Sequence, residues 1–236
     1  MKKLIIIFLL PVLIVSAHAQ TLPTADEVIN KYIAALGGKK ALMKVNNVTS
    51  QGLLQFDNSP AQMQITLKRK MPAKALTLIT GDNDQLLYKN VINGTNVVEI
   101  TQQGTTRQNE QAARLSLMYN RLFPELVFKE QGIKSTLVGK EQIDGQDAYK
   151  VTSTFADGTP LWISYYDVAT GLKVQNVIKW DQSRTATLKS SDYRTVNGVK
   201  IPFSSTYQEN GGGVSMTKMT SVLVNKGISD AEFNVQ

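Results

Sequence analysis

Apolar and polar residues alternate along most of the chain, which is the pattern of half-buried β-strands. In the segment AQMQITLKRK, at positions 61–70, the apolar residues Met63, Ile65 and Leu67 fall on one face of the predicted strand. The same alternation predicts strands at 73–81, 84–92 and 96–101, and further strands from about residue 134 almost to the end. Turn signals separate neighbouring strands at Asn93-Gly94, Asp144-Gly145, Asp157-Gly158, Thr170-Gly171, Asn197-Gly198 and Asn210-Gly211. This order predicts an antiparallel meander.

Two segments depart from the alternation and follow helical spacing instead. After a capping box formed by Thr24 and Glu27, apolar residues recur every three or four positions until Gly37-Gly38, which predicts a helix. Within residues 108–122 the apolar side chains fall on one helical stripe, and Pro124 ends the pattern, which predicts an inserted helix. The expected fold is therefore mainly β (α+β), with one helix before the meander and one in its middle.

The first 19 residues have the features of an export signal. Lys2 and Lys3 precede an apolar run from Leu4 to Val15, and Ala17-His18-Ala19 supplies the small residues of a cleavage site. The run is shorter than the roughly 20 residues that a transmembrane helix needs, and no other stretch approaches that length. We expect cleavage after Ala19, and a mature periplasmic domain at residues 20–236 with no transmembrane segment and no cysteine for lipid attachment.

Composition narrows the possible chemistry. Cysteine is absent, and the only histidine, His18, leaves with the signal peptide. This excludes Ser-His-Asp and Cys-His catalysis, zinc sites that use histidine, and thiolate sites. Asp82 and Asp84 lack the further ligands of a calcium loop, so we interpret GDNDQ, at positions 81–85, as a hairpin turn. We expect no catalytic residues, no metal and no cofactor, and therefore a protein that is not an enzyme.

Positive charge is concentrated in the first third of the mature chain. Residues 20–80 contain eight Lys and Arg residues against Asp26, Glu27 and Asp57. Such a surface favours an anionic membrane or an acidic protein partner, and it is also typical of the solvated edge of a sheet. We expect no nucleic-acid partner.

Several hairpins together resemble a known family. The segments VGKEQIDGQDAYKV (138–151), YYDVATGLKV (165–174) and DYRTVNGVKIPFSSTY (192–207) form an ordered series of turns, and LKRKMPAK (67–74) adds a strand-Pro-strand junction. This series resembles the outer-membrane lipoprotein-sorting (LolA/LolB-like) superfamily, in particular the branch found alone or beside pitrilysin-type zinc peptidases. The resemblance implies a single curved antiparallel sheet, an unclosed half-barrel whose concave face is covered by helices and holds acyl chains.

The concave face is therefore the expected binding surface, and alternation assigns residues to it. The candidates for contact with a ligand are Leu54, Phe56, Met63, Ile65, Leu67, Leu76, Leu78, Ile163, Tyr165, Val174, Ile178 and Trp180. The inserted helix would act as a lid through Leu115, Met118, Leu122 and Phe123. Arg69 continues the series 63-65-67 and would contact a carboxylate or phosphate head group at the rim. Ordinary core packing, and a solvated strand end for Arg69, are the alternative interpretations.

Two hypotheses of function follow. In the first, the protein is a periplasmic binding or carrier protein for an acyl-bearing or other hydrophobic, lipid-like ligand, possibly in lipoprotein sorting to the outer membrane. In the second, it is an interaction module that serves an exported peptidase or another envelope protein complex. The resemblance covers both.

Overall fold

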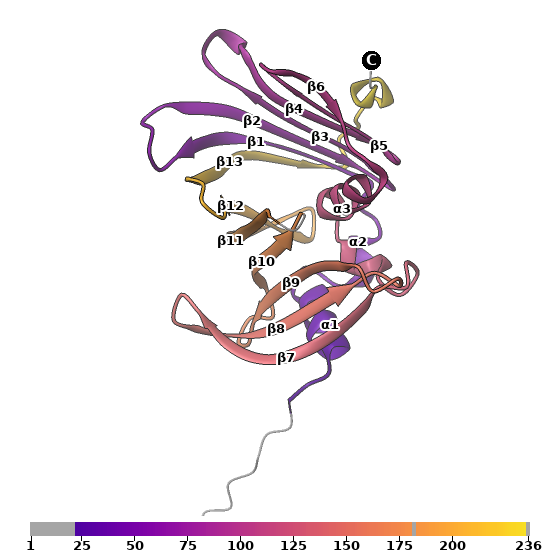
Figure 1. Ribbon diagram of the computed structural model, residues 1–236. Helices are drawn as coiled ribbons and strands as arrows, with labels where there is room; N and C mark the ends of the chain where they lie inside the picture. The colour runs from indigo at the N-terminus through magenta and orange to yellow at the C-terminus, as the bar shows by residue number, and fades with distance from the viewer. Residues whose placement is uncertain (1–21, 181–182, 235–236) are drawn as a thin grey trace, which may run out of the picture.

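One antiparallel sheet of thirteen strands frames the part of the chain that the computed structural model describes, residues 22–180 and 183–234 (Figure 1). The predicted signal peptide, residues 1–19, lies outside these ranges. The strands are β1 (Asn47–Phe56), β2 (Gln62–Lys70), β3 (Lys74–Thr80), β4 (Leu86–Asn93), β5 (Asn96–Thr101), β6 (Gly104–Arg107), β7 (Lys134–Ile143), β8 (Gln146–Thr154), β9 (Pro160–Asp167), β10 (Lys173–Lys179), β11 (Thr185–Val196), β12 (Val199–Glu209) and β13 (Val214–Val224). The predicted meander is confirmed.

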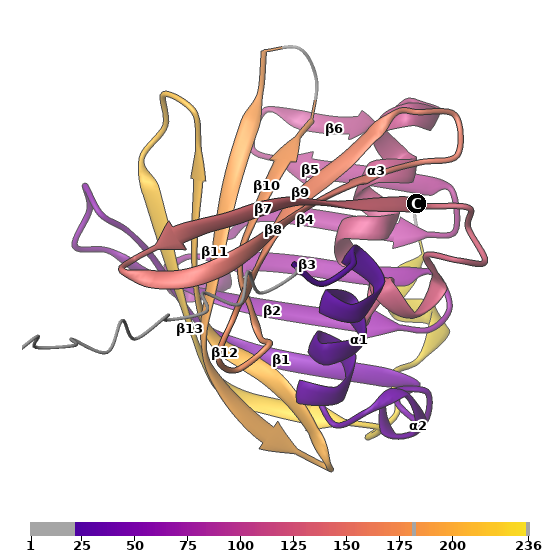
Figure 2. The same cartoon turned by 90° about the horizontal axis from the view of Figure 1, so that it is seen from below.

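The sheet curves strongly but does not close, as the resemblance implied. Its strand order is β6-β5-β4-β3-β2-β1-β13-β12-β11-β10-β9-β8-β7, so every pair except β1–β13 joins neighbours in the sequence. The two edge strands, β6 and β7, are also consecutive in the chain. The segment between them contains α3 (Glu110–Asn120) and the short helix η2 (Pro124–Val127), which therefore bridge the opening of the half-barrel (Figures 1 and 2).

Helix α1 (Ala25–Ala35) begins at the predicted capping box. The Thr24 hydroxyl accepts a hydrogen bond from the Glu27 backbone, and the Glu27 carboxylate accepts one from the Thr24 N–H at 2.7 Å. The helix buries Val28, Ile29 and Tyr32 on the concave side of the sheet, and the short α2 (Lys39–Leu42) follows it. Satisfied N-terminal donors and one apolar stripe together explain why this segment is helical.

Helix α3 is the predicted inserted helix, with ends two residues inside the predicted bounds of 108–122. Its N-cap Asn109 accepts a hydrogen bond from the Ala112 N–H at 2.9 Å. Ala113 and Leu117 pack in a small cluster with residues of β3, β4 and β5. Leu115 and Met118 belong instead to the main core, which also contains residues of α1 and β9. Helix α3 therefore packs against both halves of the curved sheet.

The convex face carries a second, smaller core under the C-terminal segment. Ile228 and Phe233, the latter in the short helix η3 (Asp230–Phe233), pack on Leu76 and Val91. Lys70 and Lys74 each contact Asp230, with N–O distances of 2.9 and 3.0 Å, and Lys68 pairs with Glu232. Three of the clustered cations are thus paired with acidic residues from the end of the chain. The remaining short helix, η1 (Asp82–Asp84), lies in the predicted turn between β3 and β4.

Candidate functional site

The concave face can be identified residue by residue from the strand register. Residues that pair directly across neighbouring strands point to the same face of a sheet. Ala75 packs against Ala113 of α3 and therefore marks the concave face, and Arg69 pairs with Ala75. Counting back from Arg69 two positions at a time, Leu67 pairs with Thr77 and Ile65 pairs with Ile79, so both residues also lie on this face. The register places Met63, Ile65, Leu67 and Arg69 of β2 on this face.

The same argument places the predicted residues of two other strands. Leu54 pairs with Met63, so Leu54 and Phe56 share the concave face of β1. On β10, Ile178 lies in the main core and Trp180 stands two positions further, with its ring against Tyr119 of α3. Val174 falls at a register shift between β9 and β10.

Four predicted residues lie on the wrong face. Leu76 packs under the C-terminal segment on the convex face, and Leu78 shares that face with it. On β9 the concave positions are Trp162 and Tyr166, and Ile163 and Tyr165 alternate with them. The physical reason is that both faces of β3 and β9 are covered by other side chains there. Alternation gives the period of such a strand but not which phase points inward.

The predicted lid residues differ in burial. Leu115 and Met118 are buried in the main core, with exposed fractions of 3% and 4%. Leu122 and Phe123 are partly exposed and pack against the same core. The helix is therefore anchored by its middle, and its C-terminal end stands nearer to solvent.

Part of the concave face stays partly exposed. The helices lie toward one end of the strands, and the other end, near the β1–β2 hairpin, is free of helix (Figure 2). Several residues point into the fold but remain partly exposed: Met63, Leu67, Ile79, Tyr88, Trp180 and Tyr207. An inward-facing apolar surface that the protein does not itself cover is the usual form of a binding site for a hydrophobic ligand.

A chain of aromatic and polar groups lines one wall of this surface. The rings of Tyr119 and Trp180 meet edge to face, 5.4 Å apart. Trp180 Nε1 donates to the Tyr207 hydroxyl at 3.3 Å, and that hydroxyl donates to Glu209 Oε1 at 2.8 Å. Burial, followed by the Glu209 carboxylate, raises the pKa of Tyr207, so its hydroxyl remains a donor. On the opposite wall, burial and the nearby Glu99 raise the pKa of Tyr88 in the same way.

Sequence reasoning identified Trp180 but missed the other groups. Tyr119 follows Met118 on the predicted helix, Tyr88 and Tyr207 occupy concave positions on strands, and Glu209 ends β12. Alternation along β4 and β12 could have placed Tyr88 and Tyr207 on the concave face, but the sequence prediction considered only apolar residues in these strands.

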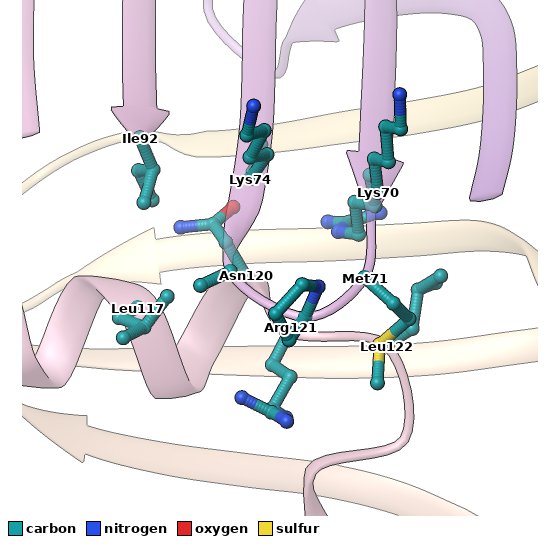
Figure 3. A pocket seen from close by; sticks show the side chains of 12 residues that line it. Lys70, Met71, Lys74, Ile92, Leu117, Asn120, Arg121 and Leu122 are labelled. Carbon is teal, nitrogen blue, oxygen red and sulfur yellow. The ribbon is translucent and has the colours of Figure 1, made fainter. Parts of the chain in front are cut away.

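Arg69 does not stand at the rim, as predicted, but under the C-terminal end of α3. It lines a crevice between the β2–β3 turn and that helix, together with Leu117, Asn120 and Arg121 (Figure 3). Burial lowers the pKa of Arg69, and the neighbouring Tyr119 opposes this shift. A guanidinium nevertheless stays charged in any protein site.

The other cations of the crevice are oriented differently. Figure 3 shows Lys70 and Lys74 pointing away from Arg121, and both reach Asp230 on the convex face. Arg121, the C-cap of α3, has a buried Nε atom without a hydrogen-bond partner. Among the described residues, no acidic side chain lines the crevice.

Two further observations concern metal binding and membrane-spanning helices. In the described ranges, no set of three or more His, Cys, Asp or Glu side chains is arranged to hold a metal ion. None of the helices in those ranges is long and apolar enough to cross a membrane.

Comparison with solved structures identifies the fold. A DUF1329 family protein from Desulfovibrio piger matches with a TM-score of 0.61 at 13% identity, over 89% of this chain and 97% of that one. A putative outer membrane lipoprotein-sorting protein domain from Vibrio parahaemolyticus matches with a TM-score of 0.59 at 11% identity, over 88% of this chain and 95% of that one. A LolA superfamily protein from Nitrosomonas europaea matches with a TM-score of 0.59 at 13% identity, over 91% of this chain and 99% of that one. By sequence, no family profile and no curated protein matches. The chain thus has the LolA-like fold that its motifs predicted.

Proposed function

We propose that the protein is an exported, non-enzymatic binding or carrier protein that holds an acyl-bearing or similarly hydrophobic ligand on its concave face. The observation that carries this proposal is the inward-facing surface that stays partly exposed, from Met63 and Leu67 to Trp180. A single curved sheet that is covered by helices at only one end offers an apolar wall without filling the space in front of it.

The energetics of an acyl chain fit such a wall. Each buried methylene contributes about 0.8 kcal/mol, so a chain of sixteen carbons offers on the order of 12 kcal/mol. Association costs about 4–15 kcal/mol, so micromolar binding is within reach from apolar contact alone. The ligand-contacting set in this proposal is Leu54, Phe56, Met63, Ile65, Leu67, Ile178 and Trp180, with Ile79, Tyr88 and Tyr207 added.

Helix α3 is the lid in this proposal. Leu115 and Met118 hold it in the core, and Leu122 and Phe123 at its C-terminal end are the side chains that can move without opening that core. Arg69 stands beside this end and would meet the polar group of the ligand. The predicted signal peptide places this activity in the periplasm, where transfer of lipoproteins to the outer membrane is one form that it can take.

A matched pair of variants tests the proposal. Leu67 and Leu78 are both partly exposed leucines of neighbouring strands, but Leu67 faces the concavity and Leu78 the convex side. We expect Leu67→Asn to weaken binding of a fluorescent fatty-acid probe about tenfold or more, and Leu78→Asn to leave it unchanged. Wild-type protein should bind the probe at micromolar concentration and change its tryptophan emission. Equal loss in both variants, or no binding by the wild type, would refute the proposal.

A second candidate, the interaction module, has one observation in its favour. Strand β7 is ten residues long and, among the described strands, pairs with β8 alone, so the other side of its backbone offers an edge for strand addition by a partner. An extended envelope peptide bound there would protect the amides of β7 from hydrogen exchange. A hydrophobic ligand in the concavity would leave them unchanged.

A further inference from the structure

We infer that the ligand is a single-chain amphiphile with a terminal carboxylate, which binds with its head inward against Arg69 and its tail toward the helix-free end. This inference rests on the proposed function and specifies the ligand of the same site. It follows from three observations: where Arg69 lies, what surrounds it, and what lines the path that leads away from it.

Arg69 lies at the helix-covered end of the concave face. It belongs to the register row that also contains Val48 and Ala75, next to the β2–β3 turn. The C-terminal end of α3 lies over it through Leu117 and Asn120. A charge placed here lies on the concave face, at the far end from the helix-free mouth, and remains partly exposed.

Arg69 also has no partner. Within residues 22–180 and 183–234, no acidic side chain forms an ion pair with it and no acceptor receives a hydrogen bond from it. The neighbouring cations differ, because Lys70 and Lys74 are neutralised by Asp230 on the other face. Because Arg69 is partly exposed and has no ion pair among the described residues, an incoming anion can form a charge-assisted interaction with it without displacing an internal partner.

An apolar path leads from Arg69 to the open end. On β2 the next concave residues are Leu67, Ile65 and Met63, and on β1 the path continues through Leu54 to Phe56. The concave positions of β1 from Val48 to Phe56 span eight residue steps, about 26 Å of strand. This length accommodates an extended long acyl chain.

Two carboxylates of the concave face have tyrosine neighbours. Glu209 lies past the row formed by Tyr207, Ser215 and Phe56, at the open end, and its Oε1 accepts from Tyr207. Glu99 lies beside Tyr88, in the row of Leu67, Thr77 and Asn90, one row from Arg69. The negative charge of Glu209 disfavours retention of an anionic head at the mouth.

One guanidinium selects a carboxylate over a phosphate. The fork of N–H donors in Arg matches the two oxygens of a carboxylate. A phosphate monoester carries a further oxygen and up to a second charge, and Lys70 and Lys74, which line the same crevice, are already paired with Asp230.

Calorimetric titration with three twelve-carbon amphiphiles tests the inference. The ligands are dodecanoate, dodecanol and dodecyl phosphate, each used below its micelle concentration. We expect the wild type to bind dodecanoate about tenfold more tightly than dodecanol and more tightly than dodecyl phosphate. Arg69→Met should abolish the tenfold preference while affinity for dodecanol stays the same, and Arg69→Lys should retain part of the preference. Lys68→Met removes the same charge from the convex side of the same strand and should change nothing.

The outcomes separate the two proposals. Equal binding of dodecanoate and dodecanol by the wild type, tighter binding of the phosphate, or a preference that survives Arg69→Met overturns the inference and leaves the carrier proposal standing. Failure of all three amphiphiles to bind overturns the carrier proposal itself. Circular dichroism of each variant confirms that the sheet is intact, and Arg69→Lys provides the comparison if Arg69→Met does not fold.

Discussion

At the scale of single residues, the most unusual feature is a buried ion pair surrounded by rings. Lys173 pairs with Glu125, and their side chains are only 11% and 1% exposed. The Lys173 Nζ atom lies 5.0 Å from the ring centroid of Tyr32, 5.5 Å from that of Trp162 and 5.6 Å from that of Tyr166. Glu125 belongs to η2, directly after the lid helix, so this pair attaches the chain that follows the lid to β10.

Breaking this pair should cost far more than breaking a surface pair. We expect Glu125→Gln to destabilise the protein by about 3 kcal/mol or more, because Lys173 keeps a buried charge without its counter-ion. Urea denaturation of the variant measures this cost. The double variant Glu125→Gln with Lys173→Met should recover part of the loss, since no lone charge remains. A double variant that is less stable than Glu125→Gln alone would contradict this account.

The sequence predicted those residue-level features that depend only on local geometry. Thr24 and Glu27 form the expected capping box, and Asp167 Oδ1 accepts from the Thr170 backbone N–H at 2.7 Å, as expected for a turn residue. The sequence did not show that Leu76 and Tyr165 point away from the concave face, because both faces of their strands are covered. Nor did it reveal that Lys173 is buried, since its counter-ion lies 48 positions away.

At the scale of elements, α3 shows what a helical stripe does and does not reveal. Its spacing predicted a helix that interrupts the sheet, and the predicted bounds were correct within two residues. The stripe did not indicate two separate contacts, with Ala113 and Leu117 on one half of the sheet and Leu115 and Met118 on the other. Those contacts depend on the curvature of the sheet, which alternation does not encode.

An ion pair connects the outer side of this helix to the β8–β9 hairpin, and it should make the attachment pH-dependent. Arg114 donates to Asp157 Oδ2 at 2.6 Å and lies 3.7 Å over the Phe155 ring. The Arg114 hydrogen bond, followed by the Thr159 N–H, lowers the pKa of Asp157 from 3.8 to about 2. A carboxyl whose pKa is lower in the folded state stabilises the protein above its unfolded pKa, and this stabilisation fades as the pH falls toward 2.

We therefore expect Asp157→Asn to flatten the change in stability between pH 4 and pH 2. Urea denaturation at several pH values in this window compares the variant with the wild type, and Asp144→Asn, in the neighbouring β7–β8 turn, serves as the control. Identical pH slopes in wild type and Asp157→Asn would show that the ion pair does not contribute to folding.

At the scale of the whole molecule, the pairing of β1 with β13 determines the shape. Val48 pairs with Val224 across most of the described chain, and this contact joins two series of hairpins into one curved sheet. Hairpin signals predicted the series but not the long-range pair, because nothing local to either strand specifies the other. The family resemblance implied a single curved, unclosed sheet instead, and the partly exposed concavity is a consequence of that shape.

This architecture leads to a prediction for the stability of the entire domain. A ligand that binds only the folded state stabilises it by about 2.7 kcal/mol at a hundred times its Kd. For a domain of this size that corresponds to a rise in Tm of roughly 5–10 °C. Because residues from both halves of the sheet line the concavity, ligand binding should shift the whole thermal unfolding transition together. Leu78→Asn should behave like the wild type.

The Arg69→Met variant tests this stabilisation by the ligand most directly. Without ligand its Tm should stay close to that of the wild type, because Arg69 is partly exposed and the described residues form no ion pair with it. With dodecanoate at the same concentration its Tm should rise only about half as far, as expected for tenfold weaker binding. Scanning calorimetry with and without ligand measures both quantities. A variant that is strongly destabilised without ligand would show that Arg69 supports the fold, and a full rise in Tm would show that the ligand does not use it.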